Sequence, residues 1–171
     1  YRENDRWETG SSRDLAIYEQ AYAWAGEVEN ELLTDECFLY LYKQILTANT
    51  CVSALDDMEG SREEKELLEG QACFTRAYAY FLLANFYARP YGEATMGNPC
   101  VPLVLKPDPD MDRRYPATVG MVWEQIGKDI RRALVCLKGK SVGKVHEISY
   151  EVCLLLATRI ALFTEDYEGV I

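Results

Sequence analysis

The segment from Leu67 to Gly92 most constrains the fold, because it is apolar around almost its whole circumference and carries Arg76 near its middle. Apolar residues recur at helical spacing on two of its faces, at Leu68, Ala72, Ala79 and Leu83 and at Phe74, Ala77, Tyr78 and Phe81. A helix that is apolar on more than one side has to be covered on more than one side. We therefore expect a central helix of a helical stack, about 40 Å long.

Both ends of this helix carry recognisable signals. Ser61 and Glu64 form an S-x-x-E capping box ahead of it. After it, Pro90 disfavours the helical conformation of the residue before it, so the segment Arg89 to Gly92 should end the helix.

Four further helices are predicted from the same periodicity. They run from Ser11 to about Val28, from just after Thr34, from about Thr118 to Leu137, and from near Ser149. Their apolar stripes include Ile17, Ala21 and Trp24; Phe38, Leu41, Tyr42, Ile45, Asn49 and Val52; Trp123, Ile126, Ile130, Ala133, Leu134 and Leu137; and Val152, Leu156, Arg159 and Phe163. Trp24 and Trp123 are therefore expected in the core. Asn49 is polar on an apolar stripe, so it should hydrogen-bond to a neighbouring group.

A long segment, Ala88 to Tyr115, separates the third and fourth helices. It contains seven prolines and glycines, namely Pro90, Gly92, Gly97, Pro99, Pro102, Pro107 and Pro109. Proline is excluded from helix interiors and from central strands. Loops of this length are uncommon, and they tend to be functional or to pack as ordered excursions. The sequence therefore predicts an all-α fold with one long loop, within which Val101 to Leu105 lies extended against the helices.

Composition and charge exclude several classes of protein. The net charge is −10, and no basic cluster is interleaved with aromatic residues, which argues against nucleic acid as a partner. No apolar run reaches the roughly 18 residues of a membrane span. The length of 171 residues fits one domain. Because Asp166 to Ile171 is typical of the first turn of a helix that does not continue, we expect residues 1–171 to be one helical-repeat domain within a longer protein.

The cysteines favour packing over metal binding. There are six, at positions 37, 51, 73, 100, 136 and 153, and none forms a C-x-x-C pair. Five lie in predicted helices, where a small thiol packs well in a core. Cys100 lies in the loop, and we expect it to be the most exposed. We expect no metal and no cofactor.

Catalytic motifs are nearly absent. His146 is the only histidine, at a predicted turn, and no H-x-x-x-H, G-x-S-x-G or phosphate-binding glycine loop occurs. Carboxylate pairs that could serve glycoside hydrolysis are Asp56 with Asp57, Glu63 with Glu64, and Asp108 with Asp110. They fall at helix ends or in loops, where acidic residues cap helices or are solvated. The sequence therefore predicts no catalytic residue.

Two arginines interrupt otherwise apolar helices, Arg76 and Arg159. A buried guanidinium needs a carboxylate or several carbonyl groups. The residues could anchor an anionic ligand, or they could fix neighbouring helices through hydrogen bonds, and we favour the structural role. The candidate partners are Glu69, Asp129 and Glu151, and the sequence does not distinguish between them.

Short motifs follow one another in a fixed order from about Ala21 to the C-terminus. They are Tyr42-Lys43-Gln44-Ile45 with Ala48-Asn49; Gly70-Gln71-Ala72; Arg76-Ala77-Tyr78-Ala79-Tyr80-Phe81; Tyr87 to Gly92; Val101-Pro102-Leu103; Arg114 with Thr118-Val119; Ile126, Asp129-Ile130 and Ala133; and Leu155 to Phe163 with Asp166-Tyr167. This series resembles the SusD/RagB family of glycan-binding outer-membrane lipoproteins of Bacteroidetes. The chain departs from the family's pattern at Gln71, where glutamate is frequent, and at Ala88-Arg89.

The resemblance implies a fold and a function. The family builds its N-terminal half from tetratricopeptide-like antiparallel helix pairs, and the small residues Ala157 and Ala161 weakly echo those of the third helix. Its members are non-catalytic lipoproteins of the cell surface and outer membrane. They bind oligosaccharides or other nutrients and pass them to a SusC-type TonB-dependent transporter. The lipid anchor would lie outside this chain.

Sugar recognition needs exposed aromatic rings with polar groups nearby. Trp7, Tyr91 and Tyr115 lie in predicted loops and are the candidate ligand-binding residues. Two alternative functions remain open: a helical-repeat adaptor that binds a peptide or protein, and, less favoured, a glycan hydrolase with two facing carboxylates.

Overall fold

The computed structural model describes residues 31–107, 115–140 and 147–168, with side chains from residue 36 onward. The chain divides into two compact units, residues 1–38 and 39–171. The described residues form four long helices and a short 3-10 helix: α2 (Glu31–Ala54), α3 (Arg62–Tyr87), η2 (Glu93–Thr95), α4 (Val119–Leu137) and α5 (Tyr150–Phe163). These residues contain no strand, only an isolated antiparallel bridge between Pro99 and Thr118. The prediction of an all-α fold is confirmed, while the helix expected from Ser11 to Val28 lies outside the described residues.

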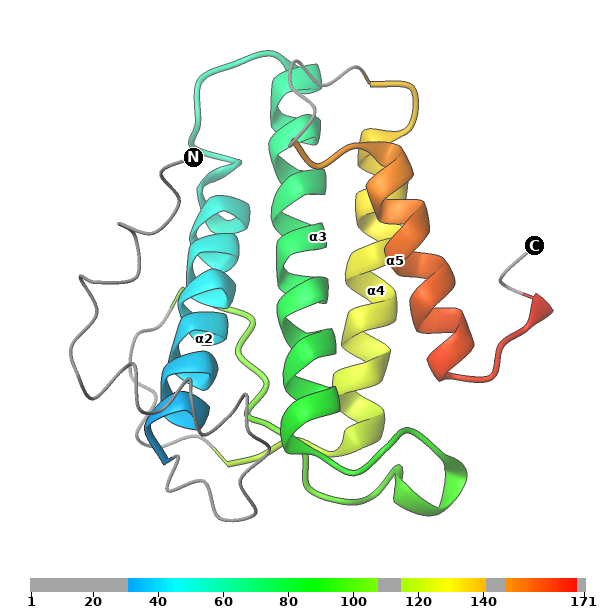
Figure 1. Cartoon of the computed structure of the whole chain (residues 1–171). Coiled ribbons are helices and arrows are strands. Elements are labelled where there is room, and N and C mark those ends of the chain that lie inside the picture. Colours follow the sequence, from blue (N-terminus) through cyan, green and yellow to red (C-terminus); the bar gives the residue numbers. More distant parts are fainter. Residues whose placement is uncertain (1–30, 108–114, 141–146, 169–171) are drawn as a thin grey trace, which may run out of the picture. The chain divides into compact units, whose positions relative to one another are not determined.

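Successive helices run in alternating directions, α2 and α4 one way and α3 and α5 the other (Figure 1). Within residues 39–171, α3 packs against α4, and α4 packs against α5. Tyr42 of α2 meets Tyr80 of α3 edge to face, with ring centroids 6.5 Å apart. Successive helices are therefore antiparallel, and α3 has α4 on one side and α2 with loop residues 101–106 on another. The expectation that both apolar faces of α3 are covered is only partly met, since Tyr78 is 41% exposed.

The start of α3 is fixed by the predicted capping box. The Ser61 hydroxyl accepts a hydrogen bond from the backbone N–H of Glu64 at 3.2 Å. In return, the Glu64 carboxylate accepts one from the backbone N–H of Ser61 at 2.8 Å. Two N–H groups that the helix itself cannot satisfy thus find partners. At the other end, Ala88 adopts an extended conformation, with φ −128° and ψ 174°, and α3 stops before Pro90.

The contact between α3 and α4 is close at Gly70. A Cβ atom built on Gly70 would lie 2.7 Å from Cγ of Leu137 and 2.9 Å from Cβ of Cys136. Only glycine permits the two helix backbones to approach this far. The side chains of Tyr80, Leu83 and Ile126 are fully buried in the surrounding core.

The two later helices differ in how they bury their faces. Thr118 and Ser149 cap them, accepting hydrogen bonds from the backbone N–H groups of Met121 and Val152. Helix α4 is amphipathic, with a buried stripe that includes Val119, Val122, Trp123, Ile126, Ile130, Ala133 and Leu137. Helix α5 buries Cys153, Leu156, Ile160 and Ala161.

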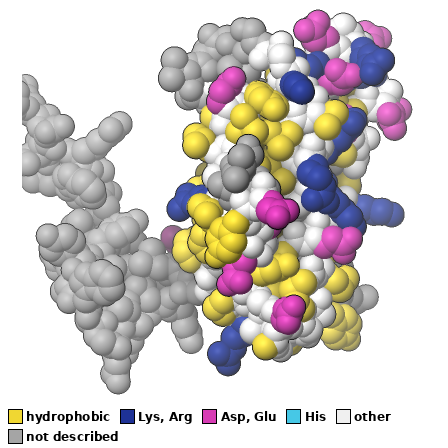
Figure 2. Space-filling view, turned by 90° about the vertical axis from the view of Figure 1, so that its right-hand side faces the viewer, with side chains coloured by type: hydrophobic (Ala, Val, Ile, Leu, Met, Phe, Trp, Pro, Cys, Tyr) yellow, Lys and Arg dark blue, Asp and Glu magenta, His cyan; other side chains and the backbone are white. Residues whose placement is uncertain are grey.

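The stripe predicted for α5 is largely wrong. Of its four residues only Leu156 is buried, whereas Val152 is 36% exposed, Phe163 is 46% exposed and Arg159 is also exposed. The buried residues are offset by about one position because α4 covers the side of α5 that carries Cys153 and Ile160. Figure 2, which views the side of the molecule where α5 lies, shows apolar side chains on its surface.

The long loop packs in an ordered way along part of its length. Val101 and Val104 are each 2% exposed. The Tyr42 hydroxyl donates to the carbonyl of Pro102 at 2.6 Å. The Tyr80 hydroxyl donates to the carbonyl of Val104 at 3.0 Å and accepts from its N–H at 2.6 Å. Polar groups that would otherwise be buried without partners are thereby satisfied, so this stretch can lie within the protein.

The cysteines of the described residues are all free. Cys73, Cys136 and Cys153 are buried, as expected for packing thiols, and Cys51 is half-buried. Two expectations are wrong: Cys100 of the loop is half-buried, and Cys37, which was expected to pack within a helix, is exposed. The loop around Cys100 is held down because the backbone N–H of Cys100 donates to the carbonyl of Ala117 at 2.8 Å. None of the described helices is long and apolar enough to cross a membrane.

Candidate functional site

Arg76 and Asp129 form a buried ion pair between α3 and α4. Nε and Nη2 of Arg76 donate to the two carboxylate oxygens of Asp129 at 2.8 and 2.6 Å. Arg76 is 8% exposed and Asp129 is 3% exposed. Of the three carboxylates that the sequence left open, Asp129 is therefore the partner of Arg76.

Asn49 joins this pair to α2 and to the loop. Its side-chain oxygen accepts from Nη1 of Arg76 at 2.7 Å, and its Nδ2 donates to the carbonyls of Val104 and Lys106 at 3.0 and 3.2 Å. Gln125 adds a donor to Asp129 at 2.9 Å. Burial lowers the pKa of Arg76, but the hydrogen bonds and charge of Asp129 outweigh it, so the pKa is raised and the group stays charged. Each of the three guanidinium nitrogens of Arg76 donates a hydrogen bond to a protein side chain, and the group is 8% exposed, which favours a structural role over ligand binding.

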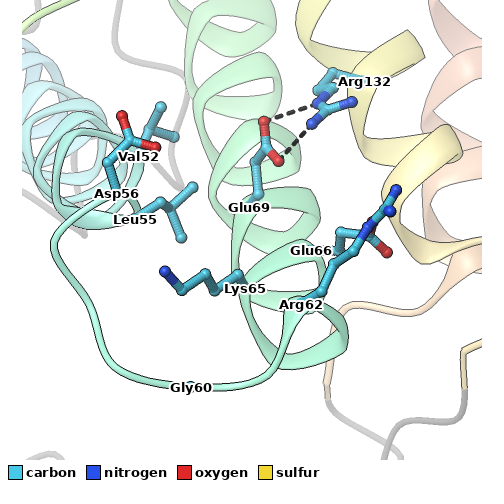
Figure 3. Close-up of a pocket in the computed structure, with 9 residues that line it drawn as sticks. All are labelled: Val52, Leu55, Asp56, Gly60, Arg62, Lys65, Glu66, Glu69 and Arg132. Carbon is cyan, nitrogen blue, oxygen red and sulfur yellow. Dashed lines mark hydrogen bonds and ion pairs between the residues drawn. The ribbon is translucent and has the colours of Figure 1, made fainter.

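A pocket of about 680 Å³ lies at the end of the helices where α2 finishes and α3 begins. Its lining residues are Val52, Leu55, Asp56, Gly60, Arg62, Lys65, Glu66, Glu69 and Arg132 (Figure 3). The close-up shows Arg132 of α4 reaching toward Glu69 of α3, and Lys65 extending toward the α2 side. The apolar part of the wall is small.

Most of the charged side chains that line the pocket form ion pairs. Arg132 makes a two-pronged contact with Glu69 at 2.7 and 2.6 Å. Glu66 accepts from Lys140 at 2.9 Å and from Arg62 at 2.8 Å. These hydrogen bonds lower the pKa of Glu66 to about 2, the contact with Lys140 contributing most. Glu66 is therefore a permanent carboxylate near neutral pH and is poorly suited to donate a proton as a general acid.

Metal binding has no support in the described part of the chain. Its residues include no group of three or more histidine, cysteine, aspartate or glutamate side chains able to hold an ion. The pocket also contains no aromatic ring that could stack on a sugar. Its lining is mostly charged side chains, so the pocket does not resemble a glycan-binding surface.

The predicted ligand-binding residues lie away from this pocket. Tyr115 is 91% exposed and precedes the first turn of α4. Tyr91 is half-buried, and its ring meets Trp123 at a centroid distance of 5.2 Å and an angle of 64°. Because α3 and α4 are antiparallel, both tyrosines lie at the same end of this helix pair, although no ring contact joins them among the described residues (Figure 1). Trp7 lies outside the described residues.

Distance separates the tyrosines from the pocket. Glu66 is in the second turn of α3, and Tyr91 follows its last residue, Tyr87. At 1.5 Å per residue the two ends of this stretch of α3 are about 30 Å apart. The pocket and the tyrosines therefore cannot contact one small ligand together.

Arg159 and Trp123 take no part in the buried ion pair or in the lining of the pocket. Arg159, expected to be buried, is exposed, so it does not carry the desolvation cost that its apolar neighbours suggested. Trp123 is buried as expected, and among the described residues its indole N–H has no hydrogen-bond acceptor. His146 lies outside the described residues. The contact between Glu69 and Arg132 was not foreseen, because nothing in the sequence pairs two residues 63 positions apart.

Antiparallel helices with an ordered loop and a buried hydrogen-bond network between them define a tetratricopeptide-like helical domain. Comparison with known proteins identifies the family. A family model described as starch-binding and associating with the outer membrane matches residues 2–159, and the chain belongs to this SusD-like family.

Solved structures show the same fold. A sugar-binding protein of Bacteroides vulgatus, described as putative in its name, has a TM-score of 0.71 at 23% identity, over 78% of this chain and 30% of its own. A SusD superfamily protein of Bacteroides thetaiotaomicron has a TM-score of 0.68 at 22% identity, over 76% and 28%. A laminarin-binding SusD-like protein has a TM-score of 0.61 at 20% identity, over 76% and 26%. The chain thus spans less than a third of each of these proteins. No curated protein matches it.

Proposed function

We propose that this chain is the helical part of a non-catalytic, glycan-binding protein of the outer membrane that hands its ligand to a SusC-type TonB-dependent transporter. The observation that carries the proposal is the family match, which extends over residues 2–159. The laminarin-binding relative supports an oligosaccharide as the ligand class. The protein would be a lipoprotein on the cell surface, anchored outside residues 1–171.

Tyr115 is the residue best placed to receive a sugar. Its ring is 91% exposed. Stacking on a pyranose would cover apolar surface that is now in water, while the phenol hydroxyl remains available for a hydrogen bond. Tyr91 is more restrained, because it rests against Trp123, and a ring held in one orientation loses less entropy on binding. Trp7 is proposed as a third contact on sequence grounds.

The charges favour binding over hydrolysis. A glycosidase needs two carboxyl groups facing the bond to be cleaved, one of them able to donate a proton. In the pocket, Glu66 and Glu69 are each engaged by basic side chains. Glu64 belongs to the capping box of α3. Because these carboxylates already make structural contacts, they support a function that does not involve covalent chemistry.

Calorimetry on the complete protein tests the proposal, with laminarin oligosaccharides and starch oligosaccharides as separate ligands. If Tyr115 stacks on the sugar, Tyr115→Ala should weaken binding about tenfold, which corresponds to roughly 1.4 kcal/mol. Tyr167→Ala is the matched control, because Tyr167 is also an exposed tyrosine, at 63%, and should leave affinity unchanged.

Two results would count against the proposal. Absence of binding to any glycan, together with capture of a peptide, would favour an adaptor. Release of reducing sugar by the intact protein would favour a hydrolase. Handover is tested separately, by asking whether the protein co-purifies with a TonB-dependent transporter from membranes that contain both.

A further inference from the structure

The solvent-facing side of α4 carries a row of basic side chains. The exposed basic residues of this helix and its C-terminal cap are Lys128, Arg131, Arg132 and Lys138. Among the exposed residues of α4, Glu124 is the one carboxylate, because Asp129 is buried against Arg76. The chain as a whole has 28 acidic and 18 basic residues, so this row is opposite in sign to the net charge of the protein.

The row follows one face of the helix. Exposed residues recur every three or four positions, at Met121, Glu124, Lys128, Arg131, Val135 and Lys138. The ten residues from Lys128 to Lys138 span about 15 Å. Tyr115, which is proposed above as a sugar contact, precedes the first turn of α4. Tyr115 and the basic row therefore lie along one helix.

Several donors of this row are not used by the protein. Lys128 pairs with Glu124 at 2.7 Å, but both side chains are more than half exposed, and such pairs are weak. Arg132 uses Nε and Nη2 for Glu69, which leaves Nη1 able to donate elsewhere. Arg131 and Lys138 have no ion-pair partner in the part of the chain that the structure describes.

The net charge of −10 does not prevent an anion from binding to this row. At physiological ionic strength, interactions between exposed charges are largely screened beyond about 8 Å. The electrostatic potential next to α4 is therefore set mainly by the side chains of α4 and their immediate partners.

The surroundings of the row favour one class of anionic partner. The apolar stripe of α4 is buried in the protein, so this helix has no apolar face to insert into a membrane. Its one aromatic residue, Trp123, is buried, so nucleic acid bases would find no ring to stack on. Guanidinium groups bind carboxylate and sulfate groups through two parallel hydrogen bonds. Val135, which is 69% exposed, adds apolar surface between Arg131 and Lys138.

We propose that the exposed face of α4 from Lys128 to Lys138 binds an acidic glycan, which carries carboxylate or sulfate groups on its sugars. This inference rests on the proposed function and narrows its ligand class. Arg131 and Lys138 make the main contacts with the anionic groups, because their donors are free. Val135 lies against a sugar ring between them, and a longer glycan continues along α4 toward Tyr115.

Calorimetry on the complete protein tests this inference, with oligogalacturonate, heparin oligosaccharides and neutral laminarin oligosaccharides as separate ligands. The double variant Arg131→Gln/Lys138→Gln removes two exposed cations without breaking an ion pair, so the fold should be retained. Lys43→Gln/Lys106→Gln is the matched control, because it removes the same charge from exposed positions outside α4. We expect the first variant to weaken binding of the tighter acidic ligand by about tenfold or more, and the control to leave it within about twofold. Added NaCl should weaken binding of the acidic ligand more than binding of laminarin.

Four results would overturn the inference. Acidic oligosaccharides might as a group bind no more tightly than laminarin, or the two double variants might lose affinity equally. Binding of DNA as tight as that of the acidic glycan would show a non-specific response to polyanions. Binding to phosphatidylglycerol vesicles without binding of acidic glycans would assign the row to a membrane surface. In each case laminarin binding would leave the proposed function standing, whereas failure of every glycan to bind would remove both.

Discussion

Arg76 on α3 and Asp129 on α4 share two hydrogen bonds, at 2.8 and 2.6 Å, in a part of the core where both side chains are buried. Asn49 extends the pair to α2 and to the carbonyls of Val104 and Lys106. One guanidinium thus connects three helices and the long loop. A buried ion pair adds little net stability compared with apolar packing, but it discriminates strongly against arrangements in which either charge lacks its partner.

Removing one member of the pair should therefore cost much more than removing both. Asp129→Ala leaves the Arg76 charge buried without its carboxylate, and we expect a loss of about 3 to 5 kcal/mol in the free energy of unfolding, measured with urea. The double variant Arg76→Met/Asp129→Leu should recover most of that loss. Glu124→Ala, which breaks the exposed contact with Lys128, is the control and should have no measurable effect. Equal losses in the single and double variants would contradict this account.

The close contact at Gly70 gives a second prediction. In Gly70→Ala, the new methyl group would meet Leu137 and Cys136 at distances below 3 Å, so α3 and α4 must move apart. We expect a loss of about 1 to 3 kcal/mol in the free energy of unfolding. At Gly127→Ala the nearest atoms belong to the guanidinium end of Arg131, which can move aside. That control should gain about 0.5 to 1 kcal/mol from higher helix propensity, and a loss there as large as at position 70 would count against a local clash.

Features that depend on a few neighbouring residues could be predicted from the sequence. The capping box of Ser61 and Glu64 needs only residues three positions apart, and it is present as expected. Asn49 stood out as polar on an apolar stripe, and it is buried and hydrogen-bonded. The order of motifs predicted the family, and the family model that matches residues 2–159 confirms it.

Features that depend on tertiary contacts could not be predicted. The sequence does not distinguish between three possible partners of Arg76, namely Glu69, Asp129 and Glu151. The choice depends on which helices lie side by side. The covered face of α5 was misassigned because a helix with apolar residues on every side has no unique periodicity. The pocket near Glu66 joins α2, α3 and α4, and its ion pairs have no local signature. The candidate ligand-binding residues could be proposed from their loop positions, and they remain to be tested by binding.

The buried thiols should be unreactive toward alkylating reagents in the folded protein. Burial raises the pKa of Cys73 and of Cys153 to about 12, so very little thiolate forms at pH 8. Under native conditions a maleimide should therefore label the exposed Cys37 rapidly and leave Cys73, Cys136 and Cys153 unmodified. In urea all six cysteines should react. Native labelling of Cys153 as fast as that of Cys37 would show that α5 is not packed on α4 as described.

The contacts of Glu66 predict how stability depends on pH. Lys140 and Arg62 lower its pKa from 4.5 to about 2 in the folded protein. Between these values the unfolded chain takes up a proton more readily than the folded one, so acid favours unfolding. The stabilising contribution of Glu66 should be complete above about pH 4.5 and should be lost as the pH falls toward 2.

Thermal melts from pH 2.5 to 7 provide the measurement. The difference in Tm between the wild type and Glu66→Gln should be largest near neutral pH and should shrink below about pH 4.5, because protonation removes the charge that the substitution removes. Glu59→Gln is an exposed control for the general effect of losing one negative charge. In a Lys140→Met background, the pH-dependent difference should become smaller, since Lys140 makes the largest contribution to the shifted pKa. An unchanged difference in that background would assign the effect to Arg62 alone.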